Sequence, residues 1–196
     1  SNPNNGWVRF SRLGTVLTPR AMIKTDPHSP LGRYVVQLRE WGFNVVLCDG
    51  NPDEHPKAWS NFCQFLKDKG MGMLINRRWA DSKDADFPSP DNSDPSVREK
   101  FCPYKKATRA YWEKKVEQDF KIFPDIMGYN IRAIDCFYEN KKFRNTSFDG
   151  APWMCECNDC KSRTPRERTR EAIGLIADLL DKHGAKLLWD TTQDDP

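Results

Sequence analysis

Residues 29–51 read SPLGRYVVQLREWGFNVVLCDGN. Ser29 followed by Pro30 is typical of a helix start, because serine accepts hydrogen bonds from first-turn N–H groups and proline tolerates the first helical position. Apolar residues then recur at helical spacing until Gly42 ends the helix. A continuous apolar run follows at 44–48, which is typical of a strand buried on both faces. This stretch predicts a helix, a glycine turn and a buried strand.

The same unit recurs along the chain. The predicted helices span residues 30–40, 56–69, 105–122 and 164–184, and the predicted strands span 20–23, 44–48, 71–75, 127–134 and 185–189. Apolar strands that alternate with helices are the signature of a parallel sheet covered by helices. Long loops follow the strands and short glycine turns follow the helices. This asymmetry suits a TIM barrel, in which the loops at the carboxyl ends of the strands build the active site.

A complete barrel has eight such units in about 250 residues, and this chain has fewer. We therefore expect an α/β fold, a (β/α) TIM-barrel-like domain formed by the first four to five βα units. It would occupy residues 20–196 after a lead-in segment at 1–19. The remaining half of the barrel, or a self-associating copy of the chain, would complete it. A doubly wound open sheet is the alternative, although no glycine-rich phosphate loop follows an early strand.

Three cysteines lie within six residues, at Cys155, Cys157 and Cys160. They cannot easily bridge one another because disulfide geometry is restrictive, and a total of seven cysteines leaves one unpaired in any full disulfide scheme. Closed structural zinc sites take four thiolates, and Cys102 is the candidate fourth ligand, because it too lies where a long loop enters a helix. The spacing predicts a structural Zn²⁺ site, with a disulfide cluster or free thiols as the alternative. Two further cysteines are expected to pack in the core: Cys48 and Cys63.

The amino-acid composition limits the classes of partner that we expect for the chain. With 31 basic and 28 acidic residues, the formal net charge is only +3, which gives no electrostatic case for nucleic acid. No apolar run approaches the ~20 residues that a membrane helix needs, so we expect no membrane partner. No signal peptide is visible, but Ser1-Asn2 resembles a tag scar, so both the cytoplasm and export with the signal removed stay open. Seven tryptophans and five tyrosines are many for 196 residues, and sugar-stacking sites use aromatics near polar loops.

Several motifs together resemble a known family. They are Phe101-Cys102-Pro103-Tyr104, Tyr111-Trp112, Phe123-Pro124-Asp125, Gly128-Tyr129 and Cys155-x-Cys157-x-x-Cys160. Over roughly residues 97–163 the chain resembles the zinc-containing β-galactosidases of glycoside hydrolase family 42. The resemblance implies that the four cysteines hold a structural zinc that pins two strand-to-helix loops beside a sugar site. Residues 95–133 are also similar to the third helix and fourth strand of bacterial α-glucuronidases. Both families are TIM-barrel glycosidases, so the resemblance implies a carbohydrate partner and, in the completed barrel, O-glycosyl hydrolysis.

A glycosidase needs two carboxyl groups flanking the scissile bond. Family 42 enzymes carry Asn-Glu at the end of strand four, with the glutamate as general acid, and the equivalent place here reads Ala133-Ile134-Asp135-Cys136. Asp135 is the candidate acid, since burial beside Tyr129 would raise its pKa, and Glu139 is the next carboxyl. Alternatively Asp135 only caps a loop or orients an arginine, and the domain binds sugar without cleaving it. The second catalytic carboxylate would lie on strands six to eight.

Polar residues also end the other predicted strands. They could hydrogen-bond a pyranose, stack on it, or pair arginines with a uronate. Alternatively these residues have no role in binding, the arginines being solvated or structural and the aspartates ordinary turn residues. The candidate substrate-binding residues are Asp49, Asn76, Arg77, Arg78, Trp79 and Asp190. A last alternative is a zinc-ribbon-like interaction module grafted on an α/β fold, which predicts an exposed metal knuckle.

Overall fold

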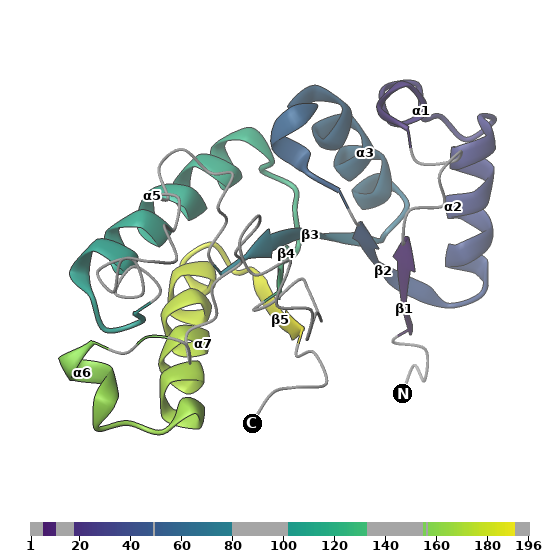
Figure 1. Cartoon of the computed structure of the whole chain (residues 1–196). Coiled ribbons are helices and arrows are strands. Elements are labelled where there is room, and N and C mark those ends of the chain that lie inside the picture. The colour runs from purple at the N-terminus through teal and green to yellow at the C-terminus, as the bar shows by residue number, and fades with distance from the viewer. Residues whose placement is uncertain are drawn as a thin grey trace, which may run out of the picture. The chain divides into compact units, whose positions relative to one another are not determined.

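In the computed structural model of the chain, the described residues are 6–10, 18–48, 50–79, 102–132, 155 and 157–190. The strands are β1 (Gly6–Phe10), β2 (Phe43–Cys48), β3 (Gly72–Arg78), β4 (Gly128–Arg132) and β5 (Lys186–Asp190). The helices are α1 (Pro19–Ile23), α2 (Pro30–Glu40), the 3-10 helix η1 (Pro52–Glu54), α3 (Pro56–Asp68), α5 (Lys106–Ile122), α6 (Asn158–Lys161) and α7 (Pro165–Asp181) (Figure 1). Strands alternate with helices, and the predicted α/β class is confirmed.

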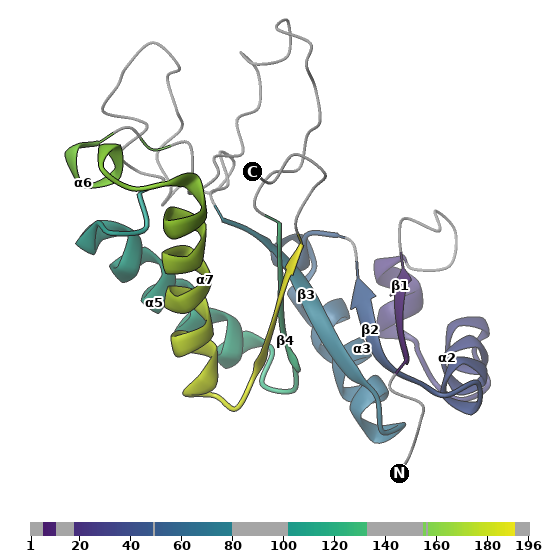
Figure 2. The same ribbon diagram turned by 90° about the horizontal axis from the view of Figure 1, so that it is seen from below.

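The strands form one sheet in the order β1-β2-β3-β4-β5, so each strand lies beside its neighbour in sequence. Strand β1 pairs with β2 in parallel, and β2 pairs with β3 in parallel (Figure 2). In the second pair Val45 lies opposite Gly72 and Cys48 lies opposite Ile75. Parallel neighbours need a crossover connection, which α1 and α2 supply between β1 and β2, and α3 between β2 and β3. The predicted parallel sheet is therefore confirmed for these strands.

The prediction of a first strand at 20–23 is wrong. These residues belong to α1, and Thr18 caps the helix by accepting a hydrogen bond from the Ala21 N–H at 3.1 Å, with Pro19 at the first helical position. A threonine cap followed by proline favours a helix start, and four apolar-rich residues are too few to show a period. The first strand is β1, which lies within the 1–19 segment and pairs with β2.

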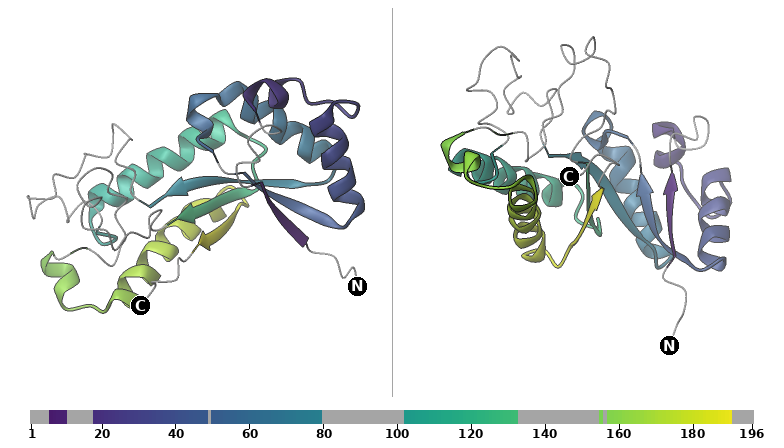
Figure 3. Two further views of the ribbon diagram at one scale, coloured as in Figure 1. Left: turned by 45° about the vertical axis from the view of Figure 1, so that its right-hand side comes forward. Right: turned by 60° about the horizontal axis from the view of Figure 1, so that its bottom comes forward.

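The chain divides into two compact units, and the first comprises residues 1–76 and 118–130. Figure 3 shows α1, α2 and α3 on the same side of strands β1 to β3. The core of this unit is apolar, and two polar contacts join its elements. The Tyr129 hydroxyl on β4 donates to the buried Asp119 carboxylate on α5 at 2.7 Å, and Lys67 on α3 pairs with Asp125. Core residues include Leu31, Val35, Val46, Phe62, Leu66, Met73 and Ile75.

Two details of the sequence analysis are confirmed in this unit. Cys48 and Cys63 are 0% and 1% exposed, so both pack in the core as expected. Gly70 follows α3 with φ of 69°, a conformation that residues with a Cβ rarely adopt, and it reverses the chain into β3.

No helix in the described segments combines the length and the apolar character that crossing a bilayer requires.

The second unit comprises residues 77–117 and 131–196. Its longest complete helix, α7, packs on β5. A capping box begins this helix: the Thr164 hydroxyl accepts from the Glu167 N–H at 3.2 Å, and the Glu167 carboxylate accepts from the Thr164 N–H at 2.7 Å. Leu175, Ile176 and Leu180 form the buried face of the helix. The cap therefore fixes the start of α7 at Pro165, one short turn after α6 and its Cys160.

The capping box makes the stability of α7 depend on pH. Hydrogen bonds from the Thr164 N–H and hydroxyl lower the pKa of the exposed Glu167. The stability that this carboxylate contributes is therefore fully present above its unfolded pKa of about 4.3 and is lost as pH falls through the lower folded value. We expect Glu167→Gln to be less stable than wild type at pH 7 and the difference to shrink toward about pH 3. Thermal melts at both pH values measure it, with Glu171→Gln on the same helix as the control, and a pH-independent difference would contradict it.

Candidate metal centre

Two segments of the second unit carry the four clustered cysteines, Cys102 in one and Cys155, Cys157 and Cys160 in the other. Cys102 opens a turn in which the Lys105 N–H donates to the Cys102 carbonyl at 3.4 Å, just before α5. Cys157 is the N-cap residue of α6, and its carbonyl accepts from the N–H groups of Cys160 and Lys161, each at 2.9 Å. Cys155 lies in neither a helix nor a strand. Local backbone hydrogen bonds thus hold Cys102, Cys157 and Cys160, and the Cys157 N–H also donates to the Cys155 sulfur.

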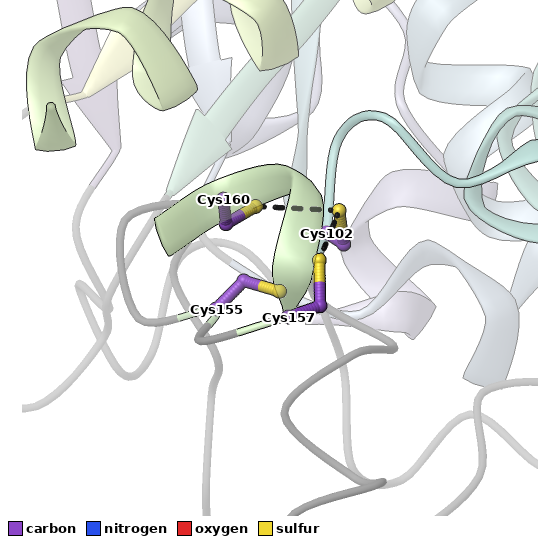
Figure 4. Close-up of side chains that lie close together, drawn as sticks. All are labelled: Cys102, Cys155, Cys157 and Cys160. Atoms are coloured by element: carbon purple, nitrogen blue, oxygen red, sulfur yellow. Dashed lines mark hydrogen bonds between the residues drawn. The ribbon is translucent and has the colours of Figure 1, made fainter. Parts of the chain in front are cut away.

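The four sulfur atoms converge on one point. All four Sγ atoms lie within 4.8 Å of one another, and Figure 4 shows them turned toward one another from the two segments. Cys102 Sγ lies 3.5 Å from Cys157 Sγ and 3.4 Å from Cys160 Sγ. Three of the cysteines are 0% exposed and Cys157 is 6% exposed. This group, in which Cys102 joins three cysteines from a stretch more than fifty residues later, could bind a metal ion.

The donor set can be tested against the size of a metal ion. Zinc binds thiolates at about 2.3 Å in tetrahedral geometry, which places ligand sulfurs ~3.8 Å apart. A disulfide instead needs about 2.05 Å, and all four cysteines are free thiols. The measured separations are therefore close to those of a tetrahedral thiolate site and far from a disulfide. No ligand position is left open in such a set, which is typical of structural sites.

Hydrogen bonds within the cluster shift the pKa values of its thiols in opposite directions. Donation from the Cys155 thiol, helped by the Tyr104 backbone, lowers the pKa of Cys102 to about 5 against the opposing effect of burial. The same bond and burial raise the pKa of Cys155, and burial with a hydrogen bond to Cys102 raises that of Cys160 to about 12. The hydrogen bonds within the cluster thus favour the thiolate form of Cys102 and the thiol forms of Cys155 and Cys160. A bound cation would deprotonate the others as well.

Aromatic and basic side chains enclose the cluster. Tyr104 packs directly against the four cysteines, and the Arg163 guanidinium lies 4.4 Å from the centre of the Tyr104 ring. The Tyr104 hydroxyl donates to the Glu167 carbonyl at 3.4 Å, which ties the Cys102 turn to α7. The Arg168 guanidinium donates to the Cys155 carbonyl. These residues were missed from the sequence, although Tyr104 stands two residues after Cys102 and both arginines follow Cys160 in a basic run.

The residues that end β3 take different positions. Asn76 accepts a 2.6 Å hydrogen bond from the Asn130 side chain on β4. Arg77 is buried, at 8% exposed, whereas Arg78 is half-buried. Trp79 is 0% exposed, so its faces are not open for stacking on a sugar in this structure. Its predicted role in a carbohydrate site would require movement or an edge contact.

An aromatic cluster explains the burial of Trp79. Its ring stacks on Trp112 of α5 at 5.8 Å between centroids, and Trp189 of β5 packs at 6.2 Å with a tilt of 54°. Tyr111 meets Trp112 edge-on at 5.5 Å. Such pairs add stabilisation beyond the burial of their area. Trp79 is therefore a core residue of the second unit.

Several predicted site residues lie outside the described residues. They are Asp49, Asp135 and Glu139. Asp190 is the last residue of β5, as expected for the carboxyl end of a strand, and its side chain is outside the described part. The structure therefore brings together the four predicted metal ligands and leaves the carboxylates as predictions.

The fold and the cluster define a class: an α/β protein with a parallel sheet and a buried four-cysteine group able to hold a metal ion. Comparison with known proteins does not narrow this class. No protein-family model matches the chain, and a search of curated proteins gives no match either.

Proposed function

We propose that Cys102, Cys155, Cys157 and Cys160 bind one structural Zn²⁺. The convergence of four buried sulfur atoms within 4.8 Å carries this proposal. Tetrahedral S₄ sets suit zinc or iron, and the resemblance to zinc-containing glycosidases favours zinc. Bound there, the ion would join the Cys102 turn to the segment that leads into α7. Its role is to fix two loops that are more than fifty residues apart.

The strand order supports a barrel-like sheet over a doubly wound one. Each strand neighbours the next in sequence, without the reversal of order that defines a doubly wound sheet. Right-handed crossovers in a sheet of this order place successive helices on one face, as in a (β/α) barrel. We therefore infer that the chain forms part of a TIM-barrel-like domain. The remaining half or a second copy of the chain would close it.

We further propose that the domain binds, and in a completed barrel cleaves, a carbohydrate. The support is the resemblance over residues 97–163 and the position of polar residues at the ends of β3 and β5. Asp135 would act as general acid, with Glu139 as the other candidate on the same loop. Asp49 and Asp190 would contact hydroxyl groups, with the residues that end β3 beside them. One sequence feature favours a non-catalytic alternative: the Asn-Glu pair of family 42 is absent from 133–136.

Metal analysis tests the first proposal. We expect the purified full chain to carry about one zinc ion and no comparable iron, measured by atomic emission after exhaustive dialysis. Iron in place of zinc would correct the identity of the metal. A metal-free chain that stays folded would refute the site.

Hydrolysis and binding assays test the carbohydrate proposal on the complete protein. Asp135→Asn should lower hydrolysis by about 10²–10⁴-fold if Asp135 is the general acid, because that is the usual contribution of such a group. Glu139→Gln should then have little effect, and the reverse pattern would move the role to Glu139. Glycan binding without hydrolysis by the parent protein would favour the non-catalytic function. No binding and no hydrolysis across a glycan array would refute both.

A further inference from the structure

Cys155 lies outside regular secondary structure, and its sulfur accepts a local hydrogen bond from the Cys157 N–H. Cys157 and Cys160 are held by backbone hydrogen bonds at the start of α6, and Cys102 by its turn. Cys155 precedes α6 and lies in no helix or strand. Metal affinity depends on ligands being held in place before the metal arrives, because ordering a loose ligand costs conformational entropy. A contact from a more distant residue that holds the Cys155 backbone in place would therefore favour metal binding.

Arg168 supplies such a contact from α7. Its Nη1 donates to the Cys155 carbonyl, and its Nε donates to the Thr164 carbonyl at 3.4 Å. Thr164 is the N-cap of α7, which the capping box fixes. One guanidinium thus links the Cys155 backbone to the capped start of α7. The planar guanidinium of arginine can donate hydrogen bonds in two directions at once, whereas the ammonium of lysine is a single point charge.

The sequence segments that carry the cysteines have an excess of positive charge, which would offset the negative charge of a zinc–thiolate centre. Four thiolates and one Zn²⁺ carry a formal charge of −2. Segments 102–109 and 155–171 contain eight basic and four acidic residues. The basic residues are Lys105, Lys106, Arg109, Lys161, Arg163, Arg166, Arg168 and Arg170. Of these, Arg168 donates directly to the backbone of a cluster cysteine and is partly buried, where charge interactions are least screened.

We propose that Arg168 is a positioning residue of the metal centre. It holds the Cys155 backbone in place and offsets part of the negative charge of the thiolates. The inference rests on the proposed zinc site and adds a residue that binds no metal itself. Loss of groups that orient metal ligands typically costs 10–100-fold in metal affinity, so Arg168→Met should weaken zinc binding by about that factor.

Competition with a chromophoric chelator on the full chain measures the zinc affinity directly. Arg166→Met is the matched control, because Arg166 is exposed on the same helix and its loss changes the net charge equally. We expect Arg166→Met to stay within about threefold of wild type, Arg168→Met to lose about 10–100-fold, and Arg168→Lys to fall between them. Metal-free Arg168→Met and Arg166→Met should melt at similar temperatures, which separates positioning from a general loss of stability.

The outcomes of these measurements distinguish a failure of the Arg168 proposal from a failure of the zinc-site proposal. Zinc binding by wild type with equal affinities in Arg168→Met and Arg166→Met would overturn the role of Arg168 and leave the zinc site standing. Wild-type affinity in Arg168→Lys would overturn the need for the guanidinium fork, and this variant decides the matter if Arg168→Met does not fold. A wild-type chain that binds no zinc would overturn both.

Discussion

Cys157→Ser is expected to abolish stoichiometric zinc binding and to destabilise the second unit. Cys157 is both a corner of the four-sulfur cluster and the N-cap of α6, and its Sγ lies 3.5 Å from that of Cys102. A serine hydroxyl stays protonated near neutral pH and is a much weaker zinc ligand than a thiolate. Structural zinc sites contribute on the order of 10 kcal/mol to folding, so losing one ligand removes a large fraction of that. Metal content and thermal melting of the same preparation measure both effects.

A matched control is available within the chain. Cys63 is as buried as the cluster cysteines but lies on α3, in the other unit. Cys63→Ala should therefore keep about one zinc per chain and lose only a modest amount of stability. Chelation with EDTA should lower the melting temperature of wild type and leave that of Cys157→Ser nearly unchanged. Equal metal content in wild type and Cys157→Ser would show that the ion, if any, binds elsewhere.

Trp79→Ala is expected to cost about 3–5 kcal/mol of unfolding free energy, the usual range for a fully buried aromatic. Trp79 is 0% exposed and is packed by Trp112 and Trp189, so the truncation would leave a large cavity between β3, α5 and β5. Denaturant unfolding followed by circular dichroism measures the loss. Trp79→Phe should recover a substantial part of it, because a smaller ring fills some of the same space.

Trp41→Ala is the control for Trp79→Ala, because it removes the same side chain from an exposed position. Trp41 is the C-cap residue of α2 and is 63% exposed, so Trp41→Ala should change the stability by no more than about 0.5 kcal/mol. If the two variants were equally stable, the buried aromatic cluster would not exist in solution. Trp79 would then be free to face a ligand, as the sequence alone had suggested.

Local features were predictable because their causes lie within a few residues. The Ser29-Pro30 start of α2, the Thr164–Glu167 capping box and the glycine turns after helices all depend on hydrogen bonds or φ angles of adjacent residues. At residues 20–23 two local signals conflict, because the apolar side chains favour a strand and the preceding residues favour a helix start. The Thr18-Pro19 cap was the stronger signal, and it makes these residues helical.

Residue types and their spacing by themselves determined the α/β class, the alternation of helices with buried strands, and the choice of Cys102, Cys155, Cys157 and Cys160 as one ligand set. These follow from short-range periodicity and from the few ways that thiols can be used. Only the tertiary structure decided that Trp79 is enclosed by Trp189 and that Arg168 holds Cys155. Contacts between residues distant in the chain depend on how whole elements pack, and no local pattern encodes which side chains then meet.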